Sequence, residues 1–382
     1  MRSLPPGLLA PAYDAHGLTS VLPAVLASLV DHETTAAGTL PPGRRAVVVL
    51  VDGLGDDLLR QRSGHAPFLR GLLPRARRLL AGFPSTTATS MGSFGTGLPP
   101  GSHGLVGYQV LVPERDLLLN ELSFDVAVDP RRWQPHETVF EQAVAAGVAV
   151  TRIGPGFFDG SGLTTAALRG GAFAAAQSLS DRVDAAVAAL RAAPRALVYL
   201  YWGDLDKVGH VSGCQSLEWG DELESIDAAL GQLAARMPAD TALYVTGDHG
   251  MLDVPFDRRL DLAYDEELAS GVRHAGGEPR SPQLYCEPGA AADVLATWGE
   301  RLGDQALVLG RDEAVALGWF GAVEARVLPR IGDVVVAMVA QAAVVDSRTA
   351  RPQVLALLGM HGSLTSAEIA VPLLSVPAGT SG

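Results

Sequence analysis

Short runs of β-branched and other apolar residues recur along the chain, and most of them end in a glycine and a polar residue. The five runs are residues 45–57 (RAVVVLVDGLGDD), 147–156 (GVAVTRIGPG), 196–206 (ALVYLYWGDLD), 241–250 (TALYVTGDHG) and 352–362 (PQVLALLGMHG). A continuous apolar run of this length is typical of a strand that is buried on both faces of a sheet. The runs therefore predict a central, mostly parallel sheet.

Stretches with a helical period separate these runs. Residues 180–193 and 220–237 are rich in alanine and leucine and have polar residues at helical spacing. The apolar residues on one face of the second stretch are Leu223, Ile226, Leu230 and Leu233. Strands that alternate with amphipathic helices predict an α/β fold with helices on both faces of the sheet.

Residues 254–345 differ from the rest, because they are mixed in polarity and rich in loop-forming residues. We expect them to form a smaller subdomain, inserted between the fourth run and the last. The chain as a whole, residues 1–382, is predicted to be a single catalytic domain that carries this insertion.

The composition excludes several classes of protein. Hydrophobic residues make up 48% of the chain and charged residues 19%, which excludes a disordered protein. The formal net charge of -13 argues against bulk binding of nucleic acid. The two cysteines, Cys214 and Cys286, provide neither a disulfide framework nor a thiolate zinc site. Without a signal-peptide pattern or a long apolar run, the sequence predicts a cytoplasmic protein that does not enter a membrane, and it specifies no oligomeric state.

Acidic and imidazole side chains follow four of the predicted strands. They are Asp52, Asp204, Asp206, His210, Asp248, His249 and His361. The carboxyl ends of parallel strands meet at one edge of a sheet, so these side chains are expected to lie close together. Carboxylate oxygens and neutral imidazole nitrogens bind zinc without thiolates, and six to eight such groups are enough for about two ions.

Residues 81–108 add a dense group of hydroxyl side chains, which precedes a glycine-rich turn. The hydroxyl residues are Ser85, Thr86, Thr87, Thr89 and Ser90. A hydroxyl becomes a good nucleophile when a base or a metal ion lowers its pKa, and paired metals stabilise an in-line displacement at phosphorus. A hydroxyl at the start of a helix also places backbone N–H groups near the transferred phosphoryl group.

With these motifs in this order, the chain resembles the alkaline phosphatase superfamily, and within it the type I phosphodiesterase and nucleotide pyrophosphatase branch. The resemblance runs from VVLVDGLG to GMHGSLTSAEIAVPLL and includes VDG, LDKVGH, GDHG and MHGS. It implies an alkaline-phosphatase-like α/β fold with two metal ions. The ligands that it implies are Asp206, His210 and His361 for one metal, and Asp52, Asp248, His249 and the nucleophile oxygen for the other.

The same resemblance implies a nucleophile and a substrate-binding position. The family's nucleophile stands ten residues before the glycine of a TG pair, which here leads from Gly97 to Thr87. Thr86 is the alternative, because the local STTATS departs from the branch's Thr-Phe-Pro-Asn. The asparagine that binds phosphate oxygen in the nucleotide pyrophosphatases corresponds to Tyr108, and Asn120 is a candidate to replace it.

The function predicted from these residues is metal-dependent hydrolysis of small phosphoric esters, by way of a covalent phospho-threonine. Phosphodiesters or nucleotide pyrophosphates are the favoured substrates, and zinc is the favoured metal, although the ligand types also suit manganese. The alternative is a phosphomonoesterase or phosphonate hydrolase, which an arginine aimed into the site would favour. Arg131, Arg132 and Arg152 are the candidates for that role. A second alternative is a catalytically inactive, metal-stabilised binding protein, whereas a sulfatase is disfavoured because Cys-x-Pro-x-Arg is missing.

Overall fold

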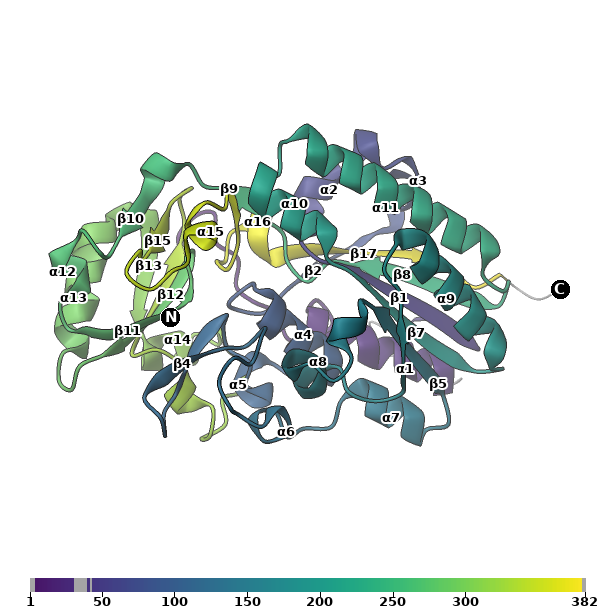
Figure 1. The fold of residues 1–382 in the computed structure, drawn as a ribbon, viewed down its shortest axis with the longest axis horizontal. Coiled ribbons are helices and arrows are strands. Elements are labelled where there is room, and N and C mark those ends of the chain that lie inside the picture. Colours follow the sequence, from purple (N-terminus) through teal and green to yellow (C-terminus); the bar gives the residue numbers. More distant parts are fainter. Residues whose placement is uncertain (1–3, 31–39, 42, 380–382) are drawn as a thin grey trace.

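Seven strands form the central sheet of the structure, a computed structural model that describes residues 4–30, 40–41 and 43–379 (Figure 1). In spatial order they are β2 (Arg77–Leu80), β17 (Ala370–Val376), β8 (Thr241–Thr246), β1 (Arg45–Val51), β7 (Ala196–Trp202), β5 (Ala149–Gly154) and β6 (Ala172–Ala175). Strands β8, β1, β7, β5 and β6 are parallel, and β17 runs antiparallel to both of its neighbours. The prediction of a mostly parallel sheet is confirmed.

Four of the five apolar runs supply strands of this sheet, namely β1, β5, β7 and β8. The prediction of a fifth strand from residues 352–362 is wrong. Those residues begin with the short helix α15 (Pro352–Leu355), and β16 (Gly359–Met360) pairs with β9 (Leu252–Asp253) outside the central sheet. The last central strand is instead β17, whose Pro372 lacks a backbone N–H and therefore weakens its strand pattern.

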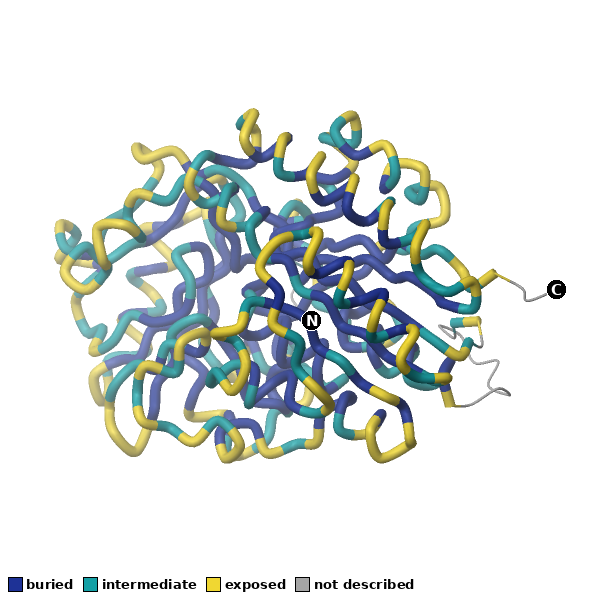
Figure 2. Tube along the Cα trace, turned by 45° about the vertical axis from the view of Figure 1, so that its right-hand side comes forward, coloured by how far each residue is buried: buried dark blue, intermediate teal, exposed yellow. Residues whose placement is uncertain are grey.

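The apolar runs are continuous because each strand is covered on both faces. Along β1, Val47, Val49 and Val51 belong to one buried cluster, whereas the alternate residues Val48 and Leu50 belong to another. Successive side chains of a strand point to opposite faces, so a sheet between two helical layers needs an apolar residue at every position. In Figure 2 the buried residues accordingly run along the strands, and the exposed ones lie on the outer sides of helices and loops.

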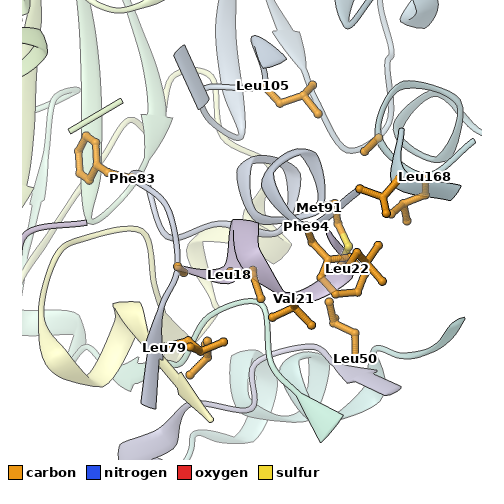
Figure 3. Close-up of a cluster of buried hydrophobic side chains, with 14 of the residues drawn as sticks. Leu18, Val21, Leu22, Leu50, Leu79, Phe83, Met91, Phe94, Leu105 and Leu168 are labelled. Carbon is orange, nitrogen blue, oxygen red and sulfur yellow. The ribbon is translucent and has the colours of Figure 1, made fainter. Parts of the chain in front are cut away.

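Two layers of helices cover the sheet (Figure 1). One layer contains α1 (Val21–Val30), α4 (Thr87–Thr96), α7 (Val139–Ala145) and α8 (Gly162–Ala167). The other contains α2 (Asp56–Gln61), α3 (Pro67–Leu72), α9 (Leu179–Ala192) and α11 (Leu217–Arg236). Met91 and Phe94 of α4 pack near Leu22 and Leu50 in the first core (Figure 3). The predicted leucine face of α11 is buried in the second core, as expected.

A second sheet with its own core lies within the range predicted to be an insertion. Its strands, in spatial order, are β11 (Val272–Glu278), β12 (Ser281–Cys286), β14 (Val334–Met338) and β13 (Ala306–Gly310). The amphipathic helix α13 (Ala291–Leu302) places Trp298 in this core. The division of the chain into a main domain and an inserted subdomain stays a prediction.

The remaining elements connect these two sheets or border the candidate site. The strands are β3 (Gln109–Val112), β4 (Leu117–Asn120), β10 (Arg259–Asp261) and β15 (Ala343–Val345). The helices are α5 (Pro100–His103), α6 (Pro130–Trp133), α10 (Asp204–Ser212), α12 (Glu266–Ala269), α14 (Arg311–Ala316) and α16 (Ser366–Ile369). Arg280, in the turn after β11, is fully buried and binds both carboxylate oxygens of Glu368 on α16, at 2.7 and 2.8 Å. This ion pair fixes the smaller sheet against the end of the central one.

Candidate metal and phosphoryl-transfer site

The six predicted metal ligands meet beyond the carboxyl ends of the central strands. Asp52 directly follows β1, Asp248 and His249 follow β8, Asp206 and His210 lie on α10 after β7, and His361 follows β16. The turn after Asp52 depends on Gly53, whose φ is +75°, a conformation that other residues rarely adopt. A Cβ atom at that glycine would also lie only 3.0 Å from the Cα atom of Asp206. The glycine therefore permits two ligand-bearing segments to approach each other.

Short distances connect all six side chains. His249 Nε2 lies 3.3 Å from Asp52 Oδ1 and 3.5 Å from Asp248 Oδ2. His210 Nε2 is 3.3 Å from Asp206 Oδ2, and His361 Nε2 is 4.0 Å from Asp206 Oδ1. The rings of His249 and His361 are stacked, with centroids 3.7 Å apart. The six groups thus form one compact, largely buried cluster.

His249 occupies the centre of this cluster. Two sets of three side chains have ligand atoms within 4.8 Å of one another, Asp52 with Asp248 and His249, and Asp206 with His249 and His361. The resemblance assigns His249 to the first set and completes the second with His210. In the structure His210 contacts Asp206 but belongs to neither set of three. The partition of the ligands between two metals therefore stays a prediction.

All three imidazoles are held in the orientation of a metal ligand. The Nδ1 atoms of His210, His249 and His361 lie 2.7 to 3.0 Å from the backbone carbonyl oxygens of Gly359, Gly250 and Ser85, respectively. Because a carbonyl oxygen only accepts hydrogen bonds, each Nδ1 carries the proton and donates. In the neutral form each Nε2 keeps a lone pair on the side of the carboxylates, which is the arrangement found behind metal-ligating histidines. Without metal, burial disfavours the charged ring of His210, but Asp206 outweighs this effect and raises the pKa of His210 to about 9, so a metal ion would displace a proton from its Nε2.

The carboxylates also lack the partners that buried charges require. Asp52 Oδ1, Asp206 Oδ1 and Asp248 Oδ2 are buried and have no hydrogen-bond partner within the described residues. Burial and repulsion from the other two carboxylates raise the pKa of Asp52 well above its usual value. Burial likewise raises the pKa of Asp248. A divalent cation would satisfy these oxygens and offset the repulsion, so the donor set fits metal binding.

The two candidate nucleophiles have different surroundings. Thr87 is the first residue of α4, and its Oγ1 lies 3.2 Å from His249 Nε2. Thr86, the N-cap of the same helix, is buried, and its hydroxyl donates a hydrogen bond to Glu278 Oε1. The unpaired N–H groups at the start of α4 face the region around Thr87. The hydroxyl of Thr87 is therefore nearer to the ligand cluster and is not held by a carboxylate.

The two predicted substrate contacts lie side by side, but they do not line the same cavities. Tyr108 lines a cavity of about 360 Å³ together with Thr87, His210 and Glu278. Asn120 does not line that cavity, and its Oδ1 accepts hydrogen bonds from the backbone N–H groups of Leu122 and Ser123 at 2.9 and 3.1 Å. Asn120 thus stabilises the turn after β4, and its side chain is hydrogen-bonded to Tyr108. Both residues line a neighbouring cavity of about 550 Å³.

A second cavity opens on the other side of Thr87. Its volume is about 350 Å³, and Asp52, Thr87 and Arg152 are among the residues that line it. The other two candidate arginines, Arg131 and Arg132, are exposed on α6 and pair with Glu141 and Asp129 instead. Of the three, Arg152 alone shares a cavity with the candidate nucleophile.

Two further residues of the site were not among the sequence-based candidates. Tyr201, inside the apolar run of β7, donates a hydrogen bond from its hydroxyl to Asp52 Oδ2. Glu278, at the end of β11, reaches from the smaller sheet to Thr86, and burial raises the pKa of its carboxyl group to about 7. A tyrosine among apolar strand residues was one available, weak signal, and the acid between a glycine pair and a proline in GGEP was the other.

We expect the replacement Tyr201→Phe to weaken metal binding by about 10- to 100-fold, because the hydroxyl fixes the orientation of Asp52. The dissociation constant for zinc, measured by competition with a chromogenic chelator, tests this expectation. Tyr244→Phe is the matched control, since Tyr244 is also buried in the central sheet but has no described hydrogen bond to a candidate ligand. Equal zinc affinities for Tyr201→Phe and the parent would show that Asp52 needs no such support.

Comparisons with known proteins agree with this geometry. The model of the type I phosphodiesterase / nucleotide pyrophosphatase family matches residues 46–364. The structure of murine ectonucleotide pyrophosphatase / phosphodiesterase 5 has a TM-score of 0.69 and 19% identity, covering 86% of this chain and 87% of that chain. An inactive variant of the murine protein, with a threonine replaced by alanine and in complex with AMP, gives a TM-score of 0.68 at 18% identity, covering 86% and 87%.

A phosphonoacetate hydrolase has the same fold. The enzyme from Sinorhizobium meliloti 1021, in complex with phosphonoacetate, has a TM-score of 0.67 and 21% identity, covering 91% of this chain and 94% of that chain. These structural likenesses confirm the predicted alkaline-phosphatase-like fold. A comparison with curated proteins gives no match. Within the described ranges, no helix has the length and apolar character needed to cross a membrane.

Proposed function

The chain belongs to the type I phosphodiesterase / nucleotide pyrophosphatase family of phosphoester hydrolases, and from this membership we propose that it cleaves small phosphodiesters or nucleotide pyrophosphates through a covalent phospho-threonine at Thr87. The observation that carries the proposal is the position of Thr87 Oγ1, 3.2 Å from His249 Nε2 at the start of α4. A hydroxyl that no carboxylate holds, the unpaired N–H groups of a helix start, and a cluster of carboxylates and imidazoles lie together there.

The proposed reaction consists of two successive displacements at phosphorus, in which different residues of the chain take part. In the first, Thr87 Oγ loses its proton and attacks phosphorus, the leaving oxygen departs with the electron pair of the broken bond and takes up a proton, and the phosphoryl group becomes attached to the threonine. In the second, water attacks the same phosphorus and Thr87 leaves, which regenerates the hydroxyl. Throughout, the N–H groups at the start of α4 bind a non-bridging oxygen of the phosphoryl group. The cavities on the two sides of Thr87 hold the substituents of the substrate.

Divalent metals are the cofactors that the donor set suits. Asp52, Asp248 and His249 would hold one ion, and Asp206, His210 and His361 would hold the other, with zinc favoured by three imidazoles beside carboxylates. When bound, such ions lower the pKa of attacking oxygens and neutralise charge on the leaving oxygen.

A phosphonate hydrolase, or a phosphomonoesterase, with the same metals is the second candidate. The observation in its favour is Arg152, because a cation in the cavity beside Thr87 suits a substrate with additional negative charge. An inactive, metal-stabilised binding protein is disfavoured, since the chain combines a complete set of ligand types with a hydroxyl that points to them.

One set of rate measurements distinguishes these activities. Zinc- or manganese-loaded protein, with its total metal determined, is assayed on a mononucleotide ester, a dinucleotide pyrophosphate, a simple phosphomonoester and a phosphonate. We expect metal-dependent turnover that is fastest on the ester or the pyrophosphate. Preference for the phosphonate or monoester would favour the second candidate, and no turnover of any substrate would favour the binding protein.

A further inference from the structure

The cavity that contains Arg152 is built from the strands β5, β6 and β7 on one side and from helices α4 and α8 on the other. It lies beside Thr87 and has aromatic walls, to which Phe158, Phe173 and Tyr201 contribute. The rings of Phe158 and Tyr201 are in edge contact, with centroids 5.6 Å apart. A cavity of this kind suits a carbon framework attached to the reacting phosphorus.

Arg152 lies in the middle of this aromatic wall. In the sheet register it stands between Tyr199 of β7 and Phe173 of β6, and its guanidinium carbon is 5.5 Å from the centre of the Phe173 ring. Its relative exposure is only 8%, and its Nε atom has no hydrogen-bond partner. Within the part of the chain that the structure describes, we find no hydrogen bond or ion pair of this guanidinium. Arg152 is therefore a buried cation without a protein anion.

Other buried arginines of the protein do have partners. Arg182 donates hydrogen bonds to the backbone oxygens of Ala176 and Tyr201, and Arg280 binds Glu368 through two nitrogens. A buried charge without an anion or a hydrogen-bond acceptor disfavours folding, because it loses hydration and a contact with an aromatic ring replaces only part of it. Arg152 thus differs from the arginines that stabilise the fold, and the missing partner is explained if it arrives with a ligand.

The charges near Arg152 do not replace such a partner. Burial lowers the pKa of Arg152, and the nearby Asp159 and Tyr199 act in the opposite direction. A guanidinium remains protonated in proteins even when it is buried, so the cavity carries a fixed positive charge. Asp52 and Asp206 line the same cavity, but they belong to the ligand cluster that metals would neutralise.

We propose that Arg152 selects substrates that carry a second anionic group, a carboxylate or a phosphate, on the substituent that occupies this cavity. The inference rests on the proposed function, because it takes the reacting phosphoryl group to lie at Thr87. Carboxylate and phosphate offer the same chemistry to the planar fork of a guanidinium, which binds two oxygens at once. The aromatic walls then pack against the carbon atoms between the two anionic groups.

Binding of matched phosphonates to the metal-loaded protein tests the inference independently of turnover. Each pair compares a probe that has a second anionic group with one that lacks it. The pairs are 4-carboxyphenylphosphonate with its methyl ester, 1,4-phenylenebisphosphonate with phenylphosphonate, and the shorter phosphonoacetate with methylphosphonate. For at least one pair we expect the doubly anionic probe to bind about 10- to 100-fold more tightly in calorimetry. The carboxylate and bisphosphonate arms show which of the two anions is preferred.

Three variants assign that preference to one side chain. Arg152→Met should reduce the affinity ratio within the preferred pair to about 1, and Arg152→Lys should retain part of it. Arg132→Met is the matched control for loss of one positive charge, because Arg132 is exposed on α6 and pairs with Asp129 away from the site, and its ratio should equal that of the parent. An unchanged ratio in Arg152→Met, or no preference in the parent, would overturn the inference.

Thermal unfolding without ligand separates a binding role from a structural one. If Arg152 gains an anionic partner only when a ligand binds, Arg152→Met should unfold at the same temperature as the parent or at a higher one. A lower unfolding temperature, with both probes of a pair weakened equally, would instead make Arg152 a structural residue. A failure of the proposed function remains distinguishable, since it would appear as absent turnover while these binding measurements still report on the cavity.

Discussion

Replacing Thr87 with alanine is expected to reduce kcat on the parent's best substrate by a factor on the order of 10⁴ or more, while the protein keeps its fold and its metal. The reason is that the proposed covalent step has no other attacking group once the hydroxyl is removed. Thr87 is only partly buried, so the loss of its side chain leaves no large cavity. Steady-state kinetics, total metal and the thermal unfolding temperature, all measured on one preparation, test the three parts of this expectation.

Thr86→Val is the matched control for Thr87→Ala. The hydroxyl of Thr86 is engaged with Glu278, and valine preserves its shape, so we expect a far smaller loss of kcat than for Thr87→Ala. The opposite order of effects would make Thr86 the nucleophile. Equal activity of Thr87→Ala and the parent would exclude a covalent step at this threonine.

Removal of metal is expected to have the largest effect on stability. At a free metal concentration a thousandfold above its dissociation constant, metal that binds the folded state alone stabilises it by about 4 kcal/mol. A chelator removes that contribution and leaves the buried carboxylates of Asp52 and Asp248 close to each other. Chemical unfolding with and without a chelator measures the difference.

The pH dependence of the chelated protein follows from the raised pKa of Asp52 and Asp248. Above the ordinary carboxyl pKa of about 4, the folded state holds protons that the unfolded state has released. The contribution of these two carboxyl groups to the unfolding free energy therefore decreases as the pH rises from there toward the raised pKa, whereas the lowered pKa of His361 acts in the opposite direction below about 6.5. Metal binding removes this decrease, because the ligands are then ionised in the folded state as well.

Asp52→Asn separates these two effects. In chelated protein at neutral pH the substitution removes a carboxyl group whose ionisation is disfavoured in the folded state but not in the unfolded state, so the variant should be more stable than the parent. In the presence of zinc the parent should be the more stable of the two, since the variant loses a ligand. Asp204→Asn, a half-exposed position on α10 outside the ligand cluster, should change neither comparison. A variant less stable than the parent under both conditions would contradict the metal-site interpretation.

The candidate metal ligands at strand ends could be predicted from the sequence because two simple rules apply to them. A strand covered on both faces gives a continuous apolar run, and polar residues that follow such runs gather at one edge of the sheet. Asp52, Asp248 and His249 follow β1 and β8 in this way, and the structure brings them within 4.8 Å of one another. Residues whose position depends on local chain direction could thus be inferred from the sequence.

Residues that reach the site through tertiary packing could not be predicted in the same way. Arg152 was predicted only as one of three candidate arginines, and nothing in the sequence distinguished it from Arg131 and Arg132. Tyr201 lies within the apolar strand β7, where only its neighbours in the fold distinguish a site residue from a core residue. Glu278 comes from the smaller sheet, and its approach to Thr86 depends on how the two sheets pack. The strand β17 was missed because Pro372 interrupts its pattern, whereas the apolar residues 352–362 pack around the site.

The stereochemical course at phosphorus tests the covalent mechanism most directly. A single enantiomer of 4-nitrophenyl phenylphosphonothioate, cleaved by the zinc-loaded protein in ¹⁸O-labelled water, gives a product whose configuration can be determined. Two successive in-line displacements, first by Thr87 and then by water, each invert the phosphorus, so the account predicts net retention of configuration. Net inversion would show that water attacks the substrate directly and would contradict the phospho-threonine intermediate.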